Sequence, residues 1–167
     1  LPIYGYNYTV YAPDNAAMQI AHEQMGLPTY DQINEVYNVA TSEDATAEEE
    51  AAGKAKARKM IDAVRAFVRY HFQNNSVFAD NHVKETSYQS LYSSDLGIPV
   101  NITSESAGGI LTVTDAANQH IVIDANANDR IVNRMARDYE YDQDKKTATS
   151  IAVSSFAVVH QVSTPLC

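Results

Sequence analysis

The hydrophobic periodicity of this chain changes once, near residue 71, and that change limits its fold more than any other feature. Between residues 14 and 71, apolar residues recur at the three- and four-residue spacing of amphipathic helices. After residue 71 they occur in short β-type runs separated by turns rich in Gly, Asn and Asp. Helices that are segregated from strands along a chain predict an α+β fold rather than an alternating α/β fold.

Capping residues mark where three helices are expected to begin. A side-chain oxygen at the position before a helix accepts a hydrogen bond from a free backbone N–H of the first turn. In a capping box, a Glu or Gln three residues later returns the bond. The candidates are Asp14, Thr29 with Gln32, and Thr46 with Glu49. We expect the first helix to run to about Met25, because Gly26 follows it.

The third helix is the longest of the three, and its sequence suggests how it packs. Five apolar residues recur on one helical face and predict a stripe that faces the core. They are Met60, Ile61, Val64, Phe67 and Val68. Glu48 to Glu50 lie in the first turn and Lys54 to Lys59 lie downstream, as the helix dipole prefers. We interpret this charge run as a solvated helix face rather than a nucleic-acid surface.

β-strands are expected at the N-terminus and throughout the second half. From Ile3 to Tyr11 the residues alternate between two faces, and Pro13 ends the run. The later runs lie at about 76–80, 110–114, 120–124, 130–134, 137–141 and 148–162. The polar stretch 134–149 is expected to form a long hairpin.

Composition narrows the classes of function. The 167 residues suit one domain with a single core. A net charge of −9 argues against phosphate backbones and anionic lipid surfaces as partners. No apolar run approaches the ~20 residues of a membrane-spanning helix, so we expect no membrane insertion. The single cysteine, Cys167, allows neither an internal disulfide nor a Cys-based zinc site.

Local motifs for catalysis or ligand binding are missing from the sequence. It has no Gly-x-Ser-x-Gly elbow and no Gly-rich phosphate loop. Asp124, Asn126 and Asn128 open like a calcium loop, but Asp129 and Met135 stand where that loop needs Gly and Glu. We therefore predict a turn there, and no catalytic residue, metal or cofactor anywhere in the chain.

Three separated segments carry a family resemblance. Thr9 to Met18 reads TVYAPDNAAM, Phe156 to Leu166 reads FAVVHQVSTPL, and Tyr70-His71 lies between them at the end of the third helix. In this order they resemble the two motifs and the Tyr-His pair of the fasciclin domain. The resemblance assigns structural roles to Thr9, Pro13, Asn15, Val158, Val159 and His160.

Two readings of the histidines follow from the residues and the resemblance. Tyr70 and His71 match the pair that animal relatives present for adhesion, which makes them candidate binding residues. Alternatively, Tyr70 packs in the core with Phe72 and His71 anchors the sheet through hydrogen bonds. We expect His160, among apolar neighbours, to be a core histidine rather than a ligand or general base.

The chain also departs from the family pattern. Ala157 replaces the usual Gly of the second motif, and Ser163 stands in place of its Asp. Family domains carry a helical segment ahead of the first motif, whereas eight residues precede Thr9 here. We therefore expect residues 1–167 to form a single fasciclin-like domain that lacks this segment.

The resemblance implies a fold and a function. The fold is a β-sandwich-like wedge with helices packed on one flank. The function is that of a non-catalytic adhesion or protein-interaction module in a secreted or lipoprotein-anchored protein of the bacterial cell surface. Its partners would be proteins or glycans of the surface or matrix, with tandem sister domains in the parent protein. The alternatives are a small-molecule binder or enzyme on the same fold, and a structural spacer in a multi-domain surface protein.

Overall fold

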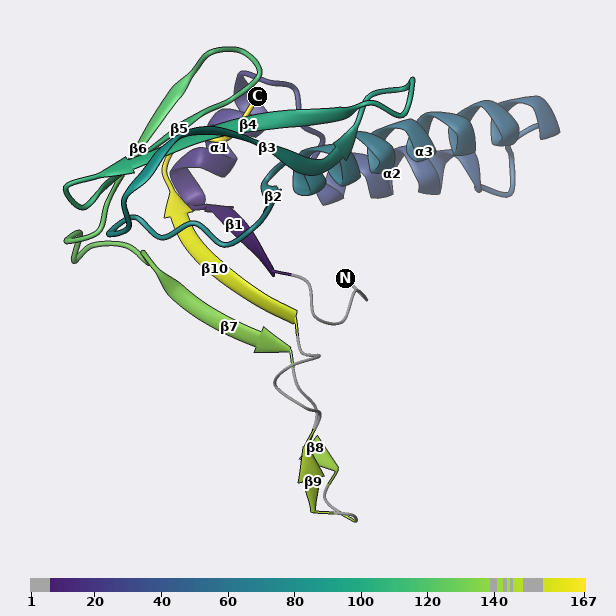
Figure 1. Ribbon diagram of the computed structural model, residues 1–167. Helices are drawn as coiled ribbons and strands as arrows, with labels where there is room; N and C mark the ends of the chain where they lie inside the picture. Colours follow the sequence, from purple (N-terminus) through teal and green to yellow (C-terminus); the bar gives the residue numbers. More distant parts are fainter. Residues whose placement is uncertain (1–6, 139–140, 143, 145, 149–154) are drawn as a thin grey trace.

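The computed structural model describes residues 7–138, 141–142, 144, 146–148 and 155–167. In this part of the chain it contains three helices, a curled sheet of eight strands and a separate two-stranded hairpin (Figure 1). The α+β class is therefore confirmed, with the helices in the first half of the chain and all strands but β1 after them.

The boundaries of the elements are as follows. The helices are α1 (Asn15–Glu23), α2 (Tyr30–Ala40) and α3 (Ala47–Tyr70). The first strands are β1 (Asn7–Pro13), β2 (Phe72–Asn74), β3 (Val83–Ser93), β4 (Pro99–Ala107) and β5 (Ile110–Thr114). The remaining strands are β6 (His120–Asp124), β7 (Arg134–Asp138), β8 (Tyr141–Asp142), β9 (Thr147–Ala148) and β10 (Ser155–Val162).

In the large sheet, the first and last strands, β1 and β10, lie side by side next to the edge strand β7. The strand order of this sheet is β6-β5-β4-β3-β2-β1-β10-β7, and β8 pairs only with β9. The β1–β10 pair is parallel, whereas every other pair in the sheet is antiparallel. The sheet curls so far that β6, at one end of the order, contacts β10 near the other end.

The hydrophobic core lies inside this curl. Buried side chains from both halves of the sheet form one cluster that includes Tyr11, Ile102, Leu111, Ile123 and Val162. The outer residues of β6 alternate with its buried ones, as expected for a strand with one face on the core.

The predicted helix starts are all confirmed. Asp14 Oδ1 accepts a bond from Ala17 N at 2.9 Å, and both capping boxes are formed. The first helix ends at Glu23, two residues earlier than expected, and Gly26 follows with φ +71°. A left-handed φ of this kind costs Gly little, which is why it suits the chain reversal after α1.

The helices α2 and α3 lie side by side and extend away from the sheet as an arm (Figure 1). They approach so closely at Gly53 that an added Cβ would lie 2.3 Å from Ala40 Cβ. Only the C-terminal end of α3 contacts the sheet, through β2 and β3. The arm is therefore held in place by the packing of α2 against α3 and by the contact of the C-terminal end of α3 with the sheet.

The predicted core stripe of α3 is only partly correct. Met60, Val64 and Phe67 are half-buried, but Ile61 is 45% exposed and Val68 is 48% exposed. The physical reason is that a single neighbouring helix covers only a narrow sector of α3. Buried positions instead go to a small residue facing α2, Ala57, and to Tyr70 at the sheet.

Several strand predictions need correction. β5 and β6 match the predicted runs 110–114 and 120–124, and β10 lies within 148–162. The run 76–80 is a loop rather than a strand, because the N–H groups of Val77 and Ala79 bond the side chains of Thr9 and Asn133; both residues are nonetheless buried. The long strands β3 and β4 were missed because polar residues fill most of their positions.

The region after β6 also differs from its prediction. Residues 130–133 are irregular, and β7 begins only at Arg134, after Asn133 with φ +54°. β7 pairs with β10, so the expected hairpin over 134–149 is replaced by an edge strand followed by the short β8–β9 pair. The predicted strand residues 3–6 and 149–154 lie outside the described part of the chain.

Candidate functional site

The two motif segments of the sequence lie side by side in the large sheet, next to its edge strand β7. β1 and β10 pair in parallel register, with Thr9 opposite Val158 and Tyr11 opposite His160. All four side chains are buried. Because both segments alternate between apolar and other residues, we expect them to share one core, and their pairing and burial confirm this. Pro13 ends β1, and the next motif residue, Asn15, is the exposed first residue of α1.

His160 is a fully buried histidine whose ring links three segments. Its Nε2 donates to the Val77 carbonyl at 2.9 Å, and its Nδ1 accepts from Asn133 N at 3.4 Å. This pair of contacts requires the neutral ring with the proton on Nε2. Burial lowers the pKa of His160, which also favours the neutral form. The predicted role as a buried, hydrogen-bonded core residue is confirmed.

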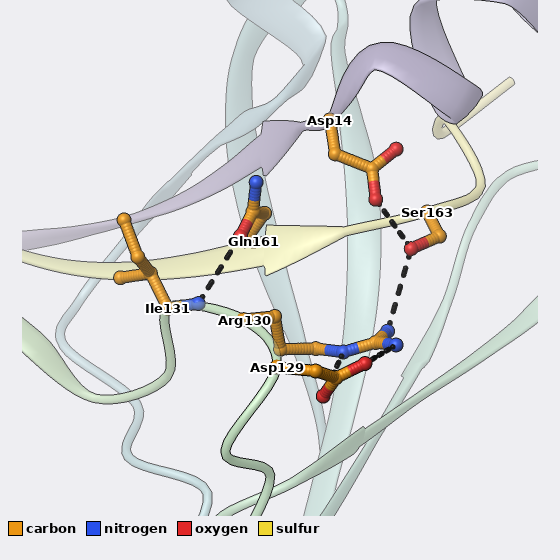
Figure 2. Close-up of polar contacts among 6 residues, drawn as sticks. All are labelled: Asp14, Asp129, Arg130, Ile131, Gln161 and Ser163. Carbon is orange, nitrogen blue, oxygen red and sulfur yellow. Dashed lines mark hydrogen bonds and ion pairs between the residues drawn. The ribbon is translucent and has the colours of Figure 1, made fainter.

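A polar cluster ties the end of β10 to the start of α1 (Figure 2). Ser163 Oγ donates to Asp14 Oδ2 at 2.5 Å, and Arg130 Nη1 donates to Ser163 Oγ at 3.4 Å. Asp129 pairs with Arg130 at 2.9 Å. The bond from Ser163, followed by that from Ala17 N, lowers the pKa of Asp14. Ser163 stands where the motif that this segment resembles has an Asp. It donates a hydrogen bond to the carboxylate of Asp14 instead of supplying a carboxylate itself.

The backbone next to this cluster is held by Gln161. Its side-chain Oε1 accepts from Ile131 N at 3.1 Å (Figure 2), and its own N–H donates to Ile131 O at 2.7 Å. The loop that precedes β7 is thus tied to β10 by a side chain and a backbone bond. The cluster can orient this loop, but a carboxylate with a lowered pKa is a weak general base, so Asp14 is poorly suited to activate Ser163.

Tyr70 and His71 occupy the junction between α3 and the sheet, and both are buried. Tyr70 Oη accepts from Ala116 N at 2.7 Å, and its ring packs edge-on against Tyr92 at 6.2 Å. The expected packing of Tyr70 with Phe72 is wrong, because strand alternation after the helix turns Phe72 the other way, towards Tyr8.

His71 uses both ring nitrogens in backbone bonds. Its Nδ1 donates to the Phe67 carbonyl at 2.8 Å, and its Nε2 accepts from Leu166 N at 3.0 Å. Burial lowers the pKa of His71, and the acceptor role of Nε2 requires a neutral ring. The second alternative for this pair is therefore right that His71 is an anchor held by hydrogen bonds, but the bonds join the C-terminal segment to the end of α3 rather than to the sheet.

Two apolar pockets flank this junction. One, of about 490 Å³, is bordered by Tyr70, Tyr92 and Met25. The other, of about 470 Å³, is bordered by Val68, His71 and Met18. Leu27 and Phe67 line both and separate them. Tyr70 and His71 thus form part of the walls of two concave surfaces, while their polar atoms bond the protein's own backbone.

The described residues contain no group of three or more His, Cys, Asp or Glu side chains placed to hold a metal ion. Asp124 and Asn126 form a turn in which the Asp124 carboxylate accepts from the Asn126 backbone and side chain. Within the same residues, no helix is long and apolar enough to cross a bilayer.

Sequence reasoning missed the residues that join the loops to the motif strands. Asn133 accepts from Ala79 N at 2.8 Å, donates to Asp80 at 2.9 Å, and its N–H reaches His160. The one local signal is that Asn tolerates the left-handed φ of this position better than most residues. Arg130 carries no such signal, because its contact with Ser163 joins residues that are distant in sequence.

In comparisons with known proteins, no protein-family model matches this chain and no curated protein matches it.

Proposed function

We propose that residues 1–167 form a fasciclin-like, non-catalytic protein-interaction module, and that the curled sheet is that family's sandwich-like wedge. One observation carries this proposal. The two motif segments, almost 150 residues apart, pair in parallel, and His71 of the Tyr-His pair between them bonds Leu166, the last residue of the second segment. The contact of the three short motifs in the fold supports the family resemblance more strongly than their order in the sequence does alone.

The proposed partners are proteins or glycans of a cell surface or matrix, bound by a secreted or lipoprotein-anchored parent protein. Tyr70 and His71 contribute by shaping the pockets at the junction, since their polar atoms are already bonded within the chain. Apolar residues at the pocket mouths, such as Met25 at 41% exposure, are available for contact. Aromatic and Met side chains are enriched in the cores of protein interfaces.

The test is retention of macromolecules by the immobilised protein. Envelope and matrix fractions are passed over wild type, Met25→Glu at a pocket mouth, and the matched control Val122→Glu on the outer face of β6. We expect a saturable protein or glycan partner that binds wild type and Val122→Glu but not Met25→Glu. A hydrolase panel runs in parallel. Turnover that is lost on changing one pocket residue, with no macromolecule retained, would overturn the proposal.

The size of the two pockets favours a second candidate, a binder of small apolar molecules. Both volumes lie within the ~300–1,000 Å³ of typical ligand pockets. Native mass spectrometry of the protein purified from its source would separate the two functions. A stoichiometric small ligand whose binding is weakened by Phe67→Trp, which enlarges a side chain that lines both pockets, would favour the second candidate.

A further inference from the structure

We propose that the outer face of α3, with the pocket beside Val68, is a docking groove for an acidic amphipathic helix of the partner. This inference rests on the proposed function and names the partner's contact chemistry. The face is defined by Lys54, Arg58, Ile61, Arg65, Val68 and Arg69, and is called the α3 face below.

The first observation is an unusual distribution of charge. Residues 54–69 hold six of the twelve Lys and Arg residues but only one of the twenty-one acidic residues, Asp62. Their net charge is therefore +5, while the rest of the chain carries −14. Lys54 to Lys59 lie downstream of the acidic first turn, on the side that the helix dipole prefers, but the effect of the dipole falls off within the last turn and is too weak in the middle of α3 to explain the cations there.

The second observation is that apolar side chains are exposed among these cations. Ile61 and Val68 are about half exposed, and Arg65 lies between them at three- and four-residue spacing on the same side of the helix. Arg58 and Arg69 are exposed on this side and make no ion pair within the described residues. Asp62 pairs with Arg65, and Lys54 pairs with Glu50.

The third observation is that the α3 face continues into a cavity. Val68 also lines the 470 Å³ pocket, whose wall includes Ile33 of α2, Met18 of α1 and Phe72 of β2. Two imidazoles line it: His22 bonds the Leu27 carbonyl through Nδ1 at 2.7 Å, and His71 bonds the backbone at Phe67 and Leu166. The result is an apolar depression with a cationic helix along one rim.

An acidic amphipathic helix fits this combination. Its apolar ridge, at positions i, i+3, i+4 and i+7, would enter the depression, and acidic residues beside the ridge would face the arginines. Electrostatic complementarity of this kind sets specificity and association rate. An anionic bilayer is a poorer match, because the −14 carried by the rest of the chain would be repelled by the same surface.

The experiment measures binding of labelled synthetic helices to the whole chain by fluorescence anisotropy. One peptide of about 15 residues has Leu at the ridge positions and Glu beside them, and a second has Lys in place of each Glu. We expect only the Glu peptide to bind, and to weaken when salt rises from about 50 to 500 mM.

Variants then locate the site. We expect Arg58→Glu/Arg65→Glu to weaken the Glu peptide about tenfold or more. The control Lys84→Glu/Arg134→Glu carries the same change of charge on exposed residues of β3 and β7 and should bind within about twofold of wild type. Val68→Asp should abolish binding. Far-UV circular dichroism establishes that each variant is folded.

Equal binding of both peptides, binding of neither, or equal losses in the two double variants would overturn the inference. So would binding to vesicles of anionic phospholipid in place of the peptide. Self-association of the chain that is lost in Arg58→Glu/Arg65→Glu would assign the α3 face to a second copy and overturn it too. The macromolecule retained in the test of the proposed function is also measured against Arg58→Glu/Arg65→Glu. If it binds this variant as tightly as wild type, the proposed function stands and the α3 face is not its docking groove.

Discussion

The curled sheet and the α2–α3 arm are stabilised in different ways, although one chain forms both. In the sheet, buried polar side chains join segments distant in sequence: His160 bonds the loop at Val77, and Thr9 bonds the same loop through its hydroxyl. In the arm, the polar bonds lie within four residues of each other, as in the capping boxes. The arm should therefore open more easily and separately from the sheet.

Side-chain exposure follows the same division. The sheet encloses its large apolar residues inside the curl, whereas the arm leaves Tyr37, Val39 and Ile61 about half exposed or more. A helix pair has too few neighbours to cover its apolar residues on all sides. The arm can therefore expose apolar residues for docking, and can open locally, while the core inside the curled sheet stays intact.

Removing the ring of His160 should have the largest effect. His160→Ala leaves the buried Val77 carbonyl unpaired and is expected to cost roughly 1–3 kcal/mol of unfolding free energy. The control is His120→Ala, whose ring is exposed and bonds only Thr114, with an expected change within about 0.5 kcal/mol. Urea denaturation measures both. Equal effects would show that the sheet does not depend on its long-range polar bonds.

In the arm, the largest effect should come from Gly53→Ala. Ala favours a helix over Gly by about 1 kcal/mol, but its Cβ would lie 2.3 Å from Ala40 Cβ. Overpacking of this kind costs about 1–3 kcal/mol, and so close a contact belongs at the upper end. We expect a net loss of about 1–2 kcal/mol, seen as faster hydrogen exchange in α2 and α3 alone. Adding Ala40→Gly to Gly53→Ala should restore part of the lost stability. If Gly53→Ala instead stabilised the arm, that would contradict the close approach of α2 and α3 at Gly53.

A smaller effect is expected from Thr46→Ala at the start of α3. The substitution removes the hydroxyl that accepts from Glu49 N and should cost about 1 kcal/mol, limited to the first turns of the arm. Circular dichroism and hydrogen exchange measure it, with Ser87→Ala on the exposed side of β3 as control. Loss of protection in the sheet would disprove the independence of the two regions.

The smallest and most graded effect should come from pH. Burial lowers the pKa of His71 and His160 below the ordinary 6.5, so the unfolded chain binds more protons than the folded one as the pH falls. Stability from these neutral rings is complete above pH 6.5 and is lost as the pH falls towards their lowered pKa values. Hydrogen bonds from Thr46 lower the pKa of Glu49 from 4.5, so the arm's cap weakens only below that pH. Exchange measured at stepwise lower pH should show the sheet losing protection before the cap, and the reverse order would contradict this assignment.

Sequence reasoning predicted the candidate site unevenly. The burial of His71 and His160 followed from their apolar neighbours, and the shared core of the motif segments followed from their alternation, but their direct parallel pairing was not predicted. The cluster of Asp14, Ser163 and Arg130 was not predicted, because its members are apart in sequence and each is an ordinary polar residue. The strands β3 and β4 were missed because Ser, Thr, Lys and Glu at their positions conceal the period of two.

By itself, the sequence determined the three helix starts, the α+β class and the turns at Gly108-Gly109 and Asn118. These depend on backbone preferences and on bonds that reach no further than about four residues. Only the tertiary structure decided the order of the strands, the ring protonation of the histidines, and which apolar residues of α3 stay exposed. Each of these depends on what another segment of the chain supplies, whether a carbonyl, an N–H or a covering surface. The neighbours of a residue in the sequence do not specify which distant segment will supply these groups.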